Sequence, residues 1–578
     1  MLVAAIVATS APRAFALPPP SISTGFSPTY IPLTGMTTLR FTIGNPNGFG
    51  ITSIGFSDDL PSGLVVSTPS SVNGDACGGT VTAAEGSTNV TLSSGSLGPH
   101  ELCGFTVSVT GSAIGDKEND VQVGSSVGPS GTVHGYVAVG APHGAVKLVK
   151  DINAGSDDGM GPTMIRVGKT VYFPATDGVH GMELWRSDAS GAGTRMVKDI
   201  DHGSPGSFDT VFYGSFATIG GVLYFAATDG THGVELWKSN GTASGTKMVK
   251  NINPAGDSSP FGLTNVGGTL FFIANDGTHG VELWKSNGTA SGTKMVKNIN
   301  PGGDSLPQFL TNAGGTLVFI ADDGTRGVEL WKSNGTRAGT QLVKDINPTG
   351  DAFPNNPTQL QPCFTFIKGT LYFVADNGTV GPQLWRSNGT KAGTRMVRAI
   401  TPPGSQPPTG LMNFNGILFF SADDGIRGSE LWRSNGRSAG TRMVKDIDPG
   451  AAGSDPGGMT NFGGTLFFSA SVGTHYGELW RSDGTSAGTR LVKDINPIDG
   501  GLPTFFRDVG GVLLFQAQDP YFGIELYRSD GTRAGTKLVD DINIGGSSVP
   551  QFLTDIGGTL LFSAYDIVHG NELRKYKP

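Results

Sequence analysis

Residues 269–299 read TLFFIANDGTHGVELWKSNGTASGTKMVKNI, and the pattern of this stretch decides the fold. In Thr269–Ala274 the residues that alternate along the chain are apolar on both faces of the expected strand, so we expect the strand to be buried on both faces. Val281–Ser286 carries Glu-Leu-Trp, and Thr293–Ile299 follows it after an Asn-Gly turn. Together with a short strand at Leu263–Val266, the stretch predicts four strands joined by hairpin turns.

The same pattern recurs from residue 147 to the end of the chain. Its most regular mark is the Trp of Glu-Leu-Trp, which returns at a period near 47 residues and accounts for every Trp of the protein. Such a period indicates an array, a solenoid or a propeller, and four strands with a doubly buried middle strand favour a β-propeller blade. The aromatic positions expected to pack between blades are Trp185, Trp237, Trp284, Trp331, Trp385, Trp432, Trp480 and Tyr527.

The two ends of the repeat region predict how it closes. It opens with Lys147–Ile152, which has the sequence of a fourth strand, and it ends with Asn571–Lys575, a third strand that no fourth strand follows. Propellers remove their open edges by letting one terminal strand complete the last blade. We therefore expect residues 146–578 to form a propeller of about nine four-stranded blades, closed by the strand 147–152.

The first 145 residues have a different organisation. Residues 1–16 contain a short apolar run and end in Ala14-Phe15-Ala16, which predicts a signal peptide and export. The basic residues of a typical signal are missing, so a frayed apolar N-terminus is the alternative. Residues 17–30 and 129–145 are rich in Pro, Ser, Gly or Thr and are interpreted as linkers. Residues 31–128 alternate short strands and turns, which predicts an all-β, immunoglobulin-like sandwich.

The three cysteines agree with an oxidising compartment. Cys77 and Cys103 lie 26 positions apart in the strand-rich segment, and Cys363 stands alone. We expect a Cys77–Cys103 disulfide and a free Cys363, with two unpaired buried thiols as the alternative. No cysteine has the spacing of a zinc ligand.

Two stretches resemble known families. TTLRFTIGNPNGFGITSIGFSDDLPSGLVV at 37–66, with CGGTVTA and CGFTVSVTG further on, is similar to the Ig-like modules of bacterial surface and secreted proteins. LWRSDGTSAGT at 479–489 and ELYRSDGTRAGT at 525–536 resemble the bacterial ELWxxDGT repeat family. The first resemblance implies a spacer without catalysis, and the second implies export without a defined activity. Gln383, Arg437 and Arg574 depart from the repeat pattern.

Composition excludes some partners. The formal net charge of −8 argues against nucleic acid and against docking by charge on anionic lipid. After the first few residues no apolar stretch is long enough to span a membrane. Glycine, with 90 residues, indicates many tight turns.

The repeated polar residues could suggest chemistry. A Glu stands two positions before each Trp or its replacement, except where Gln383 takes its place. Catalysis needs one special constellation, so we expect these carboxylates to accept hydrogen bonds from the backbone or from a Lys of the neighbouring strand. The alternative for the Trp residues is a ring of sugar-stacking sites. The eight acidic positions are Glu183, Glu235, Glu282, Glu329, Glu430, Glu478, Glu525 and Glu572.

The Asp-Gly-Thr-His turns could suggest a metal site, but Arg326 and Phe522 stand where His is usual, and neither is a common ligand. We expect no metal and no cofactor, and turn-capping roles for these Asp residues. The loops 345–351 and 494–497 offer several oxygen atoms, so Ca²⁺ is the alternative there, although the full calcium-loop pattern is missing.

These observations predict an exported, monomeric, non-enzymatic binding or scaffold protein of the bacterial surface or secretome. It would present an unknown protein or glycan ligand to one face of a propeller, with no catalytic residue. A propeller-type carbohydrate hydrolase or lyase, and a structural envelope or matrix component, are the alternatives.

Overall fold

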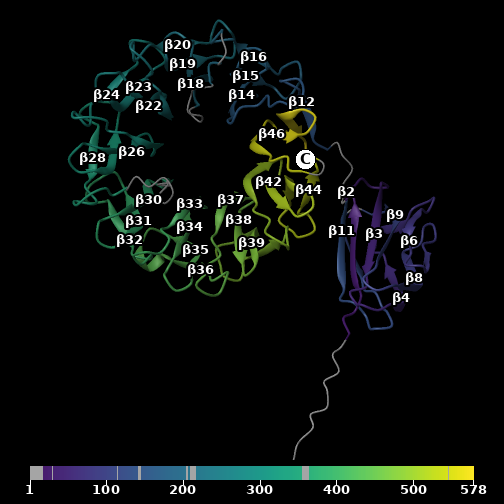
Figure 1. Ribbon diagram of the computed structural model, residues 1–578. Coiled ribbons are helices and arrows are strands. Elements are labelled where there is room, and N and C mark those ends of the chain that lie inside the picture. The colour runs from purple at the N-terminus through teal and green to yellow at the C-terminus, as the bar shows by residue number, and fades with distance from the viewer. Residues whose placement is uncertain are drawn as a thin grey trace, which may run out of the picture. The chain divides into compact units, whose positions relative to one another are not determined.

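The computed structural model describes residues 17–28, 30–113, 115–140, 145–202, 206–208, 216–353, 364–543 and 546–578. The chain divides into two compact units, Met1–Pro142 and His143–Pro578. Apart from one 3-10 turn at Ser438–Gly440, the regular structure of the described residues is β-strand (Figure 1). No described helix has the length and apolarity to cross a membrane. The expected signal peptide, residues 1–16, and Cys363 lie outside the described residues.

The described part of the repeat unit contains nine four-stranded antiparallel sheets, numbered here from sheet 1 to sheet 9. Sheets 1–3 are β13 (Ile165–Val167), β14 (Thr170–Ala175), β15 (Glu183–Ser187) and β16 (Arg195–Lys198); β17 (Ala217–Ile219), β18 (Val222–Thr228), β19 (Val234–Ser239) and β20 (Lys247–Lys250); and β21 (Phe261–Val266), β22 (Thr269–Asn275), β23 (Val281–Ser286) and β24 (Lys294–Lys297).

Sheets 4–6 repeat the same order of strands. They are β25 (Gln308–Asn312), β26 (Leu317–Asp322), β27 (Val328–Ser333) and β28 (Gln341–Lys344); β29 (Thr365–Ile367), β30 (Thr370–Asp376), β31 (Pro382–Ser387) and β32 (Arg395–Arg398); and β33 (Thr409–Phe414), β34 (Ile417–Asp423), β35 (Ser429–Ser434) and β36 (Arg442–Lys445).

Sheets 7–9 complete the series. They are β37 (Gly457–Phe462), β38 (Thr465–Val472), β39 (His475–Ser482) and β40 (Arg490–Lys493); β41 (Thr504–Val509), β42 (Val512–Asp519), β43 (Gly523–Ser529) and β44 (Lys537–Asp540); and β45 (Gln551–Asp555), β46 (Leu560–Asp566), β47 (Gly570–Tyr576) and β12 (Lys147–Lys150).

Sheet 3 illustrates the register that all nine share. Phe272 of β22 pairs with Trp284 of β23, and both are buried. A bulge then shifts β24 against β23 between Leu283 and Trp284. Because neighbouring side chains of a strand point to opposite faces, Trp284 packs toward sheet 2, beside Leu236, whereas Leu283 packs toward sheet 4. The strands predicted in this repeat are thus present, with boundaries that differ by at most two residues.

Apolar side chains fill every boundary between consecutive sheets. Nine separate clusters each combine residues of two neighbouring sheets, and one of them joins sheet 9 to sheet 1 through Leu573 and Trp185. The sheets follow one another around a ring, with fourth strands such as β24, β28 and β32 on its outside (Figure 1). The apolar faces of the first and the last sheet therefore cover each other, and no sheet in the described part of the repeat unit has an uncovered apolar face.

The strand at the start of the unit completes the sheet at its end. In β12, Lys147 pairs with Lys575 and Leu148 pairs with Arg574 of β47, in antiparallel orientation. The Val146 backbone N–H also donates to Asp540 Oδ2 of sheet 8, at 2.8 Å. This is the pairing that the sequence predicts for the strand 147–152.

Three sheets make up the N-terminal unit. The first contains β1 (Ser21–Ser27), β3 (Met36–Gly44), β9 (Leu102–Gly111), β5 (Leu64–Val66) and β6 (Val72–Asp75); the second β4 (Ile51–Asp59), β8 (Asn89–Leu97) and β7 (Thr80–Thr82); the third β10 (Gly115–Val121), β11 (Val133–Val139) and β2 (Tyr30–Ile31). Phe41 and Phe105 of the first sheet meet Phe56 of the second, with ring centroids 4.9 and 6.1 Å apart. One apolar core is common to the sheets.

A disulfide joins Cys77 to Cys103, whose Cα atoms lie 5.1 Å apart, as the sequence predicts. The expected linkers are wrong in extent, because residues 17–30 contain β1 and residues 129–145 contain β11. β1 is rich in Ser and has a weak hydrophobic signal, whereas β11 is a single apolar segment enclosed by stretches that contain Gly and Pro. In β1 only Ile22 and Phe26 are buried.

Candidate functional site

The repeated Glu is buried and fully used by the chain itself. Glu235 Oε2 accepts hydrogen bonds from Ile252 N at 2.8 Å and Ser258 Oγ at 2.7 Å, and Oε1 accepts one from Asn253 N at 3.0 Å. These donors belong to the connection between sheets 2 and 3. The carboxylate therefore fixes the path of the chain into the next sheet. Of the two donors that the sequence suggests for this carboxylate, the backbone N–H groups are found, whereas the Lys of the fourth strand binds elsewhere.

The other seven Glu side chains are equally buried. Burial raises their pKa, although hydrogen bonds from the connection lower it in part. The pKa is about 7 for Glu329 and about 8 for Glu525, where Asp541 adds a like charge. A raised carboxyl pKa is one feature of a general acid, but here it accompanies the same backbone contacts in sheet after sheet.

Gln383 shows that the position does not need a charge. Its Oε1 accepts hydrogen bonds from Ile400 N at 2.7 Å and Thr401 N at 3.2 Å, like a Glu carboxylate. Its Nε2 donates to Thr401 O at 2.6 Å. The amide thus performs the same loop-fixing role within sheet 5.

The seven Trp side chains lie between sheets. Each is at most 8% exposed, so its ring faces protein on both sides, and a sugar-stacking platform would require faces open to solvent. Lys250 Nζ of sheet 2 lies 5.6 Å from the ring centroid of Trp284 in sheet 3 and donates to Thr293 O at 3.0 Å. In eight sheets the cation that ends the fourth strand, a Lys or in sheet 5 Arg398, thus contacts the next sheet. This explains why it does not bind the Glu of its own sheet. In sheet 8, Asp540 takes its place.

The two positions where Trp is replaced keep a polar contact within their own sheet. Tyr527 is 2% exposed and its hydroxyl donates to Asp519 Oδ2 at 2.6 Å. Arg574 pairs with Asp566 and donates from Nε to Ala564 O at 3.1 Å.

The Asp-Gly turns are held by their own side chains. Asp276 Oδ1 accepts hydrogen bonds from Thr278 N at 3.0 Å and His279 N at 2.8 Å, and Oδ2 lies 2.8 Å from His279 Nδ1. Arg326 takes the His position in sheet 4 and pairs with Asp323. Partial burial raises the pKa of Asp276, but these hydrogen bonds outweigh it and hold the pKa below its ordinary value.

The loops considered for Ca²⁺ use their oxygen atoms internally. Asp351 Oδ1 accepts a hydrogen bond from Val328 N at 2.8 Å, and Asn347 Oδ1 accepts one from Thr349 Oγ1 at 2.8 Å. In the loop 494–497, Asn496 Oδ1 accepts a hydrogen bond from Ile498 N at 3.1 Å. These contacts are those of turns that close on themselves.

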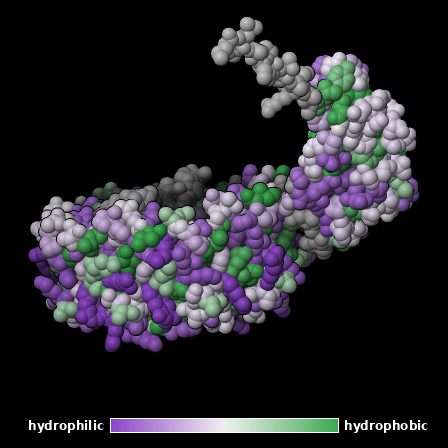
Figure 2. All heavy atoms as spheres, turned by 90° about the horizontal axis from the view of Figure 1, so that it is seen from below, coloured by the Kyte–Doolittle hydropathy of each residue, from purple (hydrophilic) through white to green (hydrophobic). Residues whose placement is uncertain are grey.

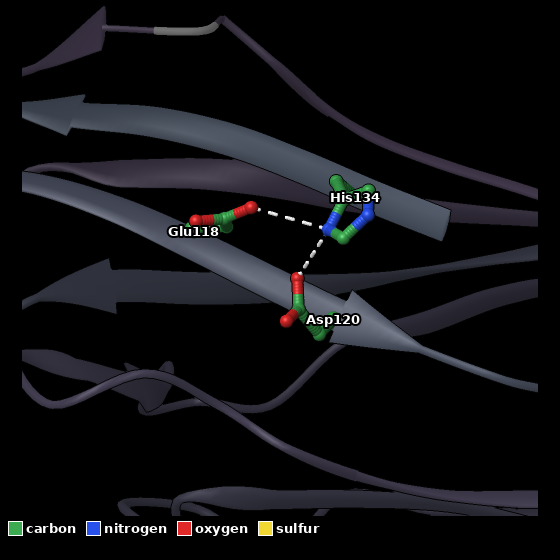
Figure 3. A group of neighbouring side chains, drawn as sticks. All are labelled: Glu118, Asp120 and His134. Carbon is green, nitrogen blue, oxygen red and sulfur yellow. Dashed lines mark hydrogen bonds and ion pairs between the residues drawn. The ribbon is translucent and has the colours of Figure 1, made fainter. Parts of the chain in front are cut away.

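One group of possible metal ligands lies on the N-terminal unit (Figure 3). Glu118 and Asp120 of β10 and His134 of β11 are exposed, and their ligand atoms lie within 4.8 Å of one another. Asp120 pairs with His134 across the strands, and Glu118, two positions away, shares their face. A His nitrogen with two carboxylate oxygens could hold a divalent cation. The residues also satisfy one another: His134 Nδ1 lies 2.7 Å from Asp120 Oδ1 and 3.1 Å from Glu118 Oε1, and the hydrogen bond with Asp120 raises the pKa of His134.

A cavity of about 570 Å³ lies where the connection from sheet 2 to sheet 3 meets the connection from sheet 3 to sheet 4. Pro260, Phe261 and Leu306 give it an apolar wall, and its polar lining includes Asp257 and Asn275. Asp257 Oδ1 already accepts a hydrogen bond from Val234 N at 2.8 Å. The sequence does not reveal this cavity, because it depends on two connections coming together beside the strands of sheets 2 and 3.

The comparisons with known proteins concern the two units separately. Residues 20–138 match a family described as a domain of unknown function, DUF7933. No curated protein matches the chain. Solved structures similar to it include a puromycin hydrolase (15% identity, 65% of this chain and 61% of that chain, TM-score 0.32) and prolyl oligopeptidase B from Galerina marginata (11%, 53% and 49%, TM-score 0.34).

A third similar structure is the dihydro-heme d1 dehydrogenase NirN (11% identity, 67% of this chain and 73% of that chain, TM-score 0.35). The chain spans about three fifths of the length of the puromycin hydrolase structures that it matches. The family match lies entirely in the N-terminal unit and does not extend into the repeat unit.

Proposed function

We propose that the protein is an exported, non-enzymatic binding or scaffold protein of the bacterial surface or secretome. In this proposal the repeat unit is a nine-bladed β-propeller of ELWxxDGT repeats that presents a ligand-binding face, and the N-terminal unit is an Ig-like spacer. The closed ring of nine sheets supports the propeller assignment. The disulfide between Cys77 and Cys103 supports an extracellular location.

The observation that carries the non-enzymatic part is the repetition of the polar contacts. An active site gathers a nucleophile, an acid or a base in one special arrangement. Here the buried Glu residues make the same bonds to the same part of the chain in successive sheets, as Glu235 and Glu282 do. These contacts make the Glu a part that holds each sheet to the next, and the ring a rigid frame for its loops.

The test is a glycan and protein array probed with the purified full chain, followed by incubation with every ligand that binds. We expect saturable binding and no release of reducing ends, unsaturated sugars or peptides. Turnover of a bound glycan that persists in repurified protein would contradict the proposal and favour a hydrolase or lyase. Self-association into polymers without any ligand would contradict it as well and favour a matrix component.

A further inference from the structure

The hairpins between the third and fourth strands concentrate positive charge. Eight of them, each ten residues long, contain nineteen Lys and Arg and only three Asp, although the chain has 40 Lys and Arg against 48 Asp and Glu. They contain no Glu. The hairpins are 186–195, 238–247, 285–294, 332–341, 386–395, 433–442, 481–490 and 528–537.

The opposite end of each sheet has the reverse charge. In antiparallel sheets, the turn between the second and third strands and the connection to the next sheet lie at the end away from these hairpins. In the part of the chain that the structure describes, those turns and connections are rich in Asp, and their only Lys or Arg residues are Arg326 and Arg427. The net charge of −8 thus combines a basic and an acidic end of every sheet.

The most regular of these cations opens the fourth strand, on the outside of the ring (Figure 1). It is present and exposed in eight of the nine sheets, and none of these eight side chains forms a hydrogen bond or ion pair with another described residue. Hydrophilic side chains cover much of the repeat unit on the face seen in Figure 2. The eight cations are Lys147, Arg195, Lys247, Lys294, Arg395, Arg442, Arg490 and Lys537.

Sheet 4 departs from this pattern but keeps a positive charge in its hairpin. There the first residue of β28 is Gln341, and the same hairpin carries an exposed Arg337 where the hairpins of sheets 2 and 3 have Ala. Exposed charges on an edge strand, Lys above all, also prevent unwanted pairing with other chains. Edge protection does not account for the further exposed cations Lys391, Arg437 and Arg533, which lie in the hairpin turns and not on the edge strand. Eight of the nine sheets have Lys or Arg at this position and none has Asp or Glu, and this bias points to a ligand of opposite charge.

Packed sheets lie about 10 Å apart, so neighbouring cations of the fourth strands are separated by about this distance or more. A small anion would contact one hairpin, whereas a linear polyanion would contact several at once and gain affinity from multivalency. None of the eight hairpins contains an aromatic residue on which a base could stack, which disfavours single-stranded nucleic acid.

We propose that the basic hairpins form a belt that binds a linear anionic polysaccharide. This inference rests on the proposed binding function and names the class of its ligand. The belt consists of the eight hairpins together with Lys147. Its affinity should be mainly electrostatic and should decrease with salt, because the cations that open its fourth strands are exposed to solvent.

The test measures binding of the full chain to dextran sulfate, to polygalacturonate and to uncharged dextran at low salt. We expect binding to a charged polymer, no binding to dextran, and loss of binding as ionic strength rises. The variant Arg395→Gln/Arg442→Gln should weaken binding about fivefold or more. The matched control Arg326→Gln/Arg427→Gln removes two charges from the opposite end and should leave the affinity unchanged.

Equal weakening in both variants, with unchanged melting temperatures, would overturn the assignment to the belt. Tighter binding to double-stranded DNA than to either charged polysaccharide would overturn the choice of ligand class. Binding of a neutral glycan or a protein from the arrays, with no affinity for either charged polymer, would overturn this inference and leave the proposed function standing. Turnover of a bound polymer would instead contradict the proposed function.

Discussion

At the scale of the residue, the boundary between two sheets depends on one pair of side chains. Lys250 lies over the ring of Trp284 and ends on a carbonyl oxygen of the sheet that holds the Trp. An attraction of this kind contributes about 0.5–2 kcal/mol, and the burial of the ring adds a larger hydrophobic part. The same pair recurs at the boundary between sheets 9 and 1 and at each following boundary up to that between sheets 6 and 7. At the boundary between sheets 5 and 6 the cation over Trp432 is Arg398.

The first prediction concerns Trp284. Because its side chain is 96% buried between sheets 2 and 3, Trp284→Ala should lower the free energy of unfolding by about 3–5 kcal/mol. Urea denaturation followed by circular dichroism measures this. Phe261→Ala is the control, since Phe261 is 42% exposed and should matter far less. An unmoved unfolding curve for Trp284→Ala, with weakened ligand binding, would favour a binding platform instead.

The second prediction concerns pH. Burial raises the pKa of Glu525 from an ordinary value near 4.5 to about 8, so the native state binds this proton more tightly than the unfolded chain does. The proton therefore stabilises the fold fully below pH 4.5, and this contribution is lost as pH rises toward 8. Asp276, whose pKa is lowered, acts in the opposite direction, but only at pH values below its ordinary range near 3.8.

The variant Glu525→Gln should keep the fold, because Gln383 occupies the equivalent site in sheet 5 with the same backbone contacts. Its melting temperature should fall less than that of the wild type between pH 5 and pH 8. The exposed Glu85→Gln is the matched control and should leave the pH dependence unchanged. Identical pH profiles for Glu525→Gln and the wild type would show that Glu525 does not titrate in this range.

At the scale of the element, the disulfide stabilises one unit and should leave the other untouched. Cys103 lies in β9, at the centre of the first sheet, and the bridge closes a loop over a separation of 26 residues. Cys103→Ser should lower the stability of the N-terminal unit by about 3–4 kcal/mol. Differential scanning calorimetry should show one transition lowered and the transition of the repeat unit unchanged, because the chain divides into two units. A Cys363-containing bridge, found by mass spectrometry of unreduced peptides, would contradict the assignment.

The strands differ in how well the sequence predicts them, for a physical reason. A strand buried on both faces, such as β22, is a continuous apolar run between turn residues, and its boundaries follow from that run. β1 has two buried side chains among Ser, Thr and Gly, and β11 is a single apolar segment between stretches that contain Gly and Pro, so composition alone predicts linkers at both places. This misassignment also hid the group of Glu118, Asp120 and His134, because cross-strand register brings these residues together.

Contacts between sheets are the part of the candidate site that the sequence could not supply. The role of Glu as a structural acceptor follows from its repetition. The destination of the Lys in the fourth strand does not, because the Thr that accepts its hydrogen bond lies more than 40 residues further on. Only the packing of one sheet against the next selects that partner over the Glu of the same sheet.

At the scale of the whole molecule, stability depends on the closure of the ring. Sheet 9 consists of three strands from the end of the chain and one from the start of the repeat unit. Contacts between sheet 9 and sheet 1 reinforce this pairing: Asn153 N donates to Glu572 Oε1 at 3.0 Å, and Lys575 Nζ donates to Ala189 O at 2.9 Å.

The last prediction follows from this arrangement. A chain that begins at Met160 lacks β12 and leaves β47 with an unpaired edge, together with the apolar side chains that Val149 and Ile152 cover. Such an edge invites aggregation, so the truncated protein should lose cooperative unfolding and aggregate, whereas a chain that begins at Gly140 keeps β12 and should fold. Size-exclusion chromatography and thermal unfolding of both chains measure the difference. A soluble monomer beginning at Met160, with the melting temperature of the longer chain, would show that the ring does not need its closing strand and that an open solenoid describes the repeat unit better.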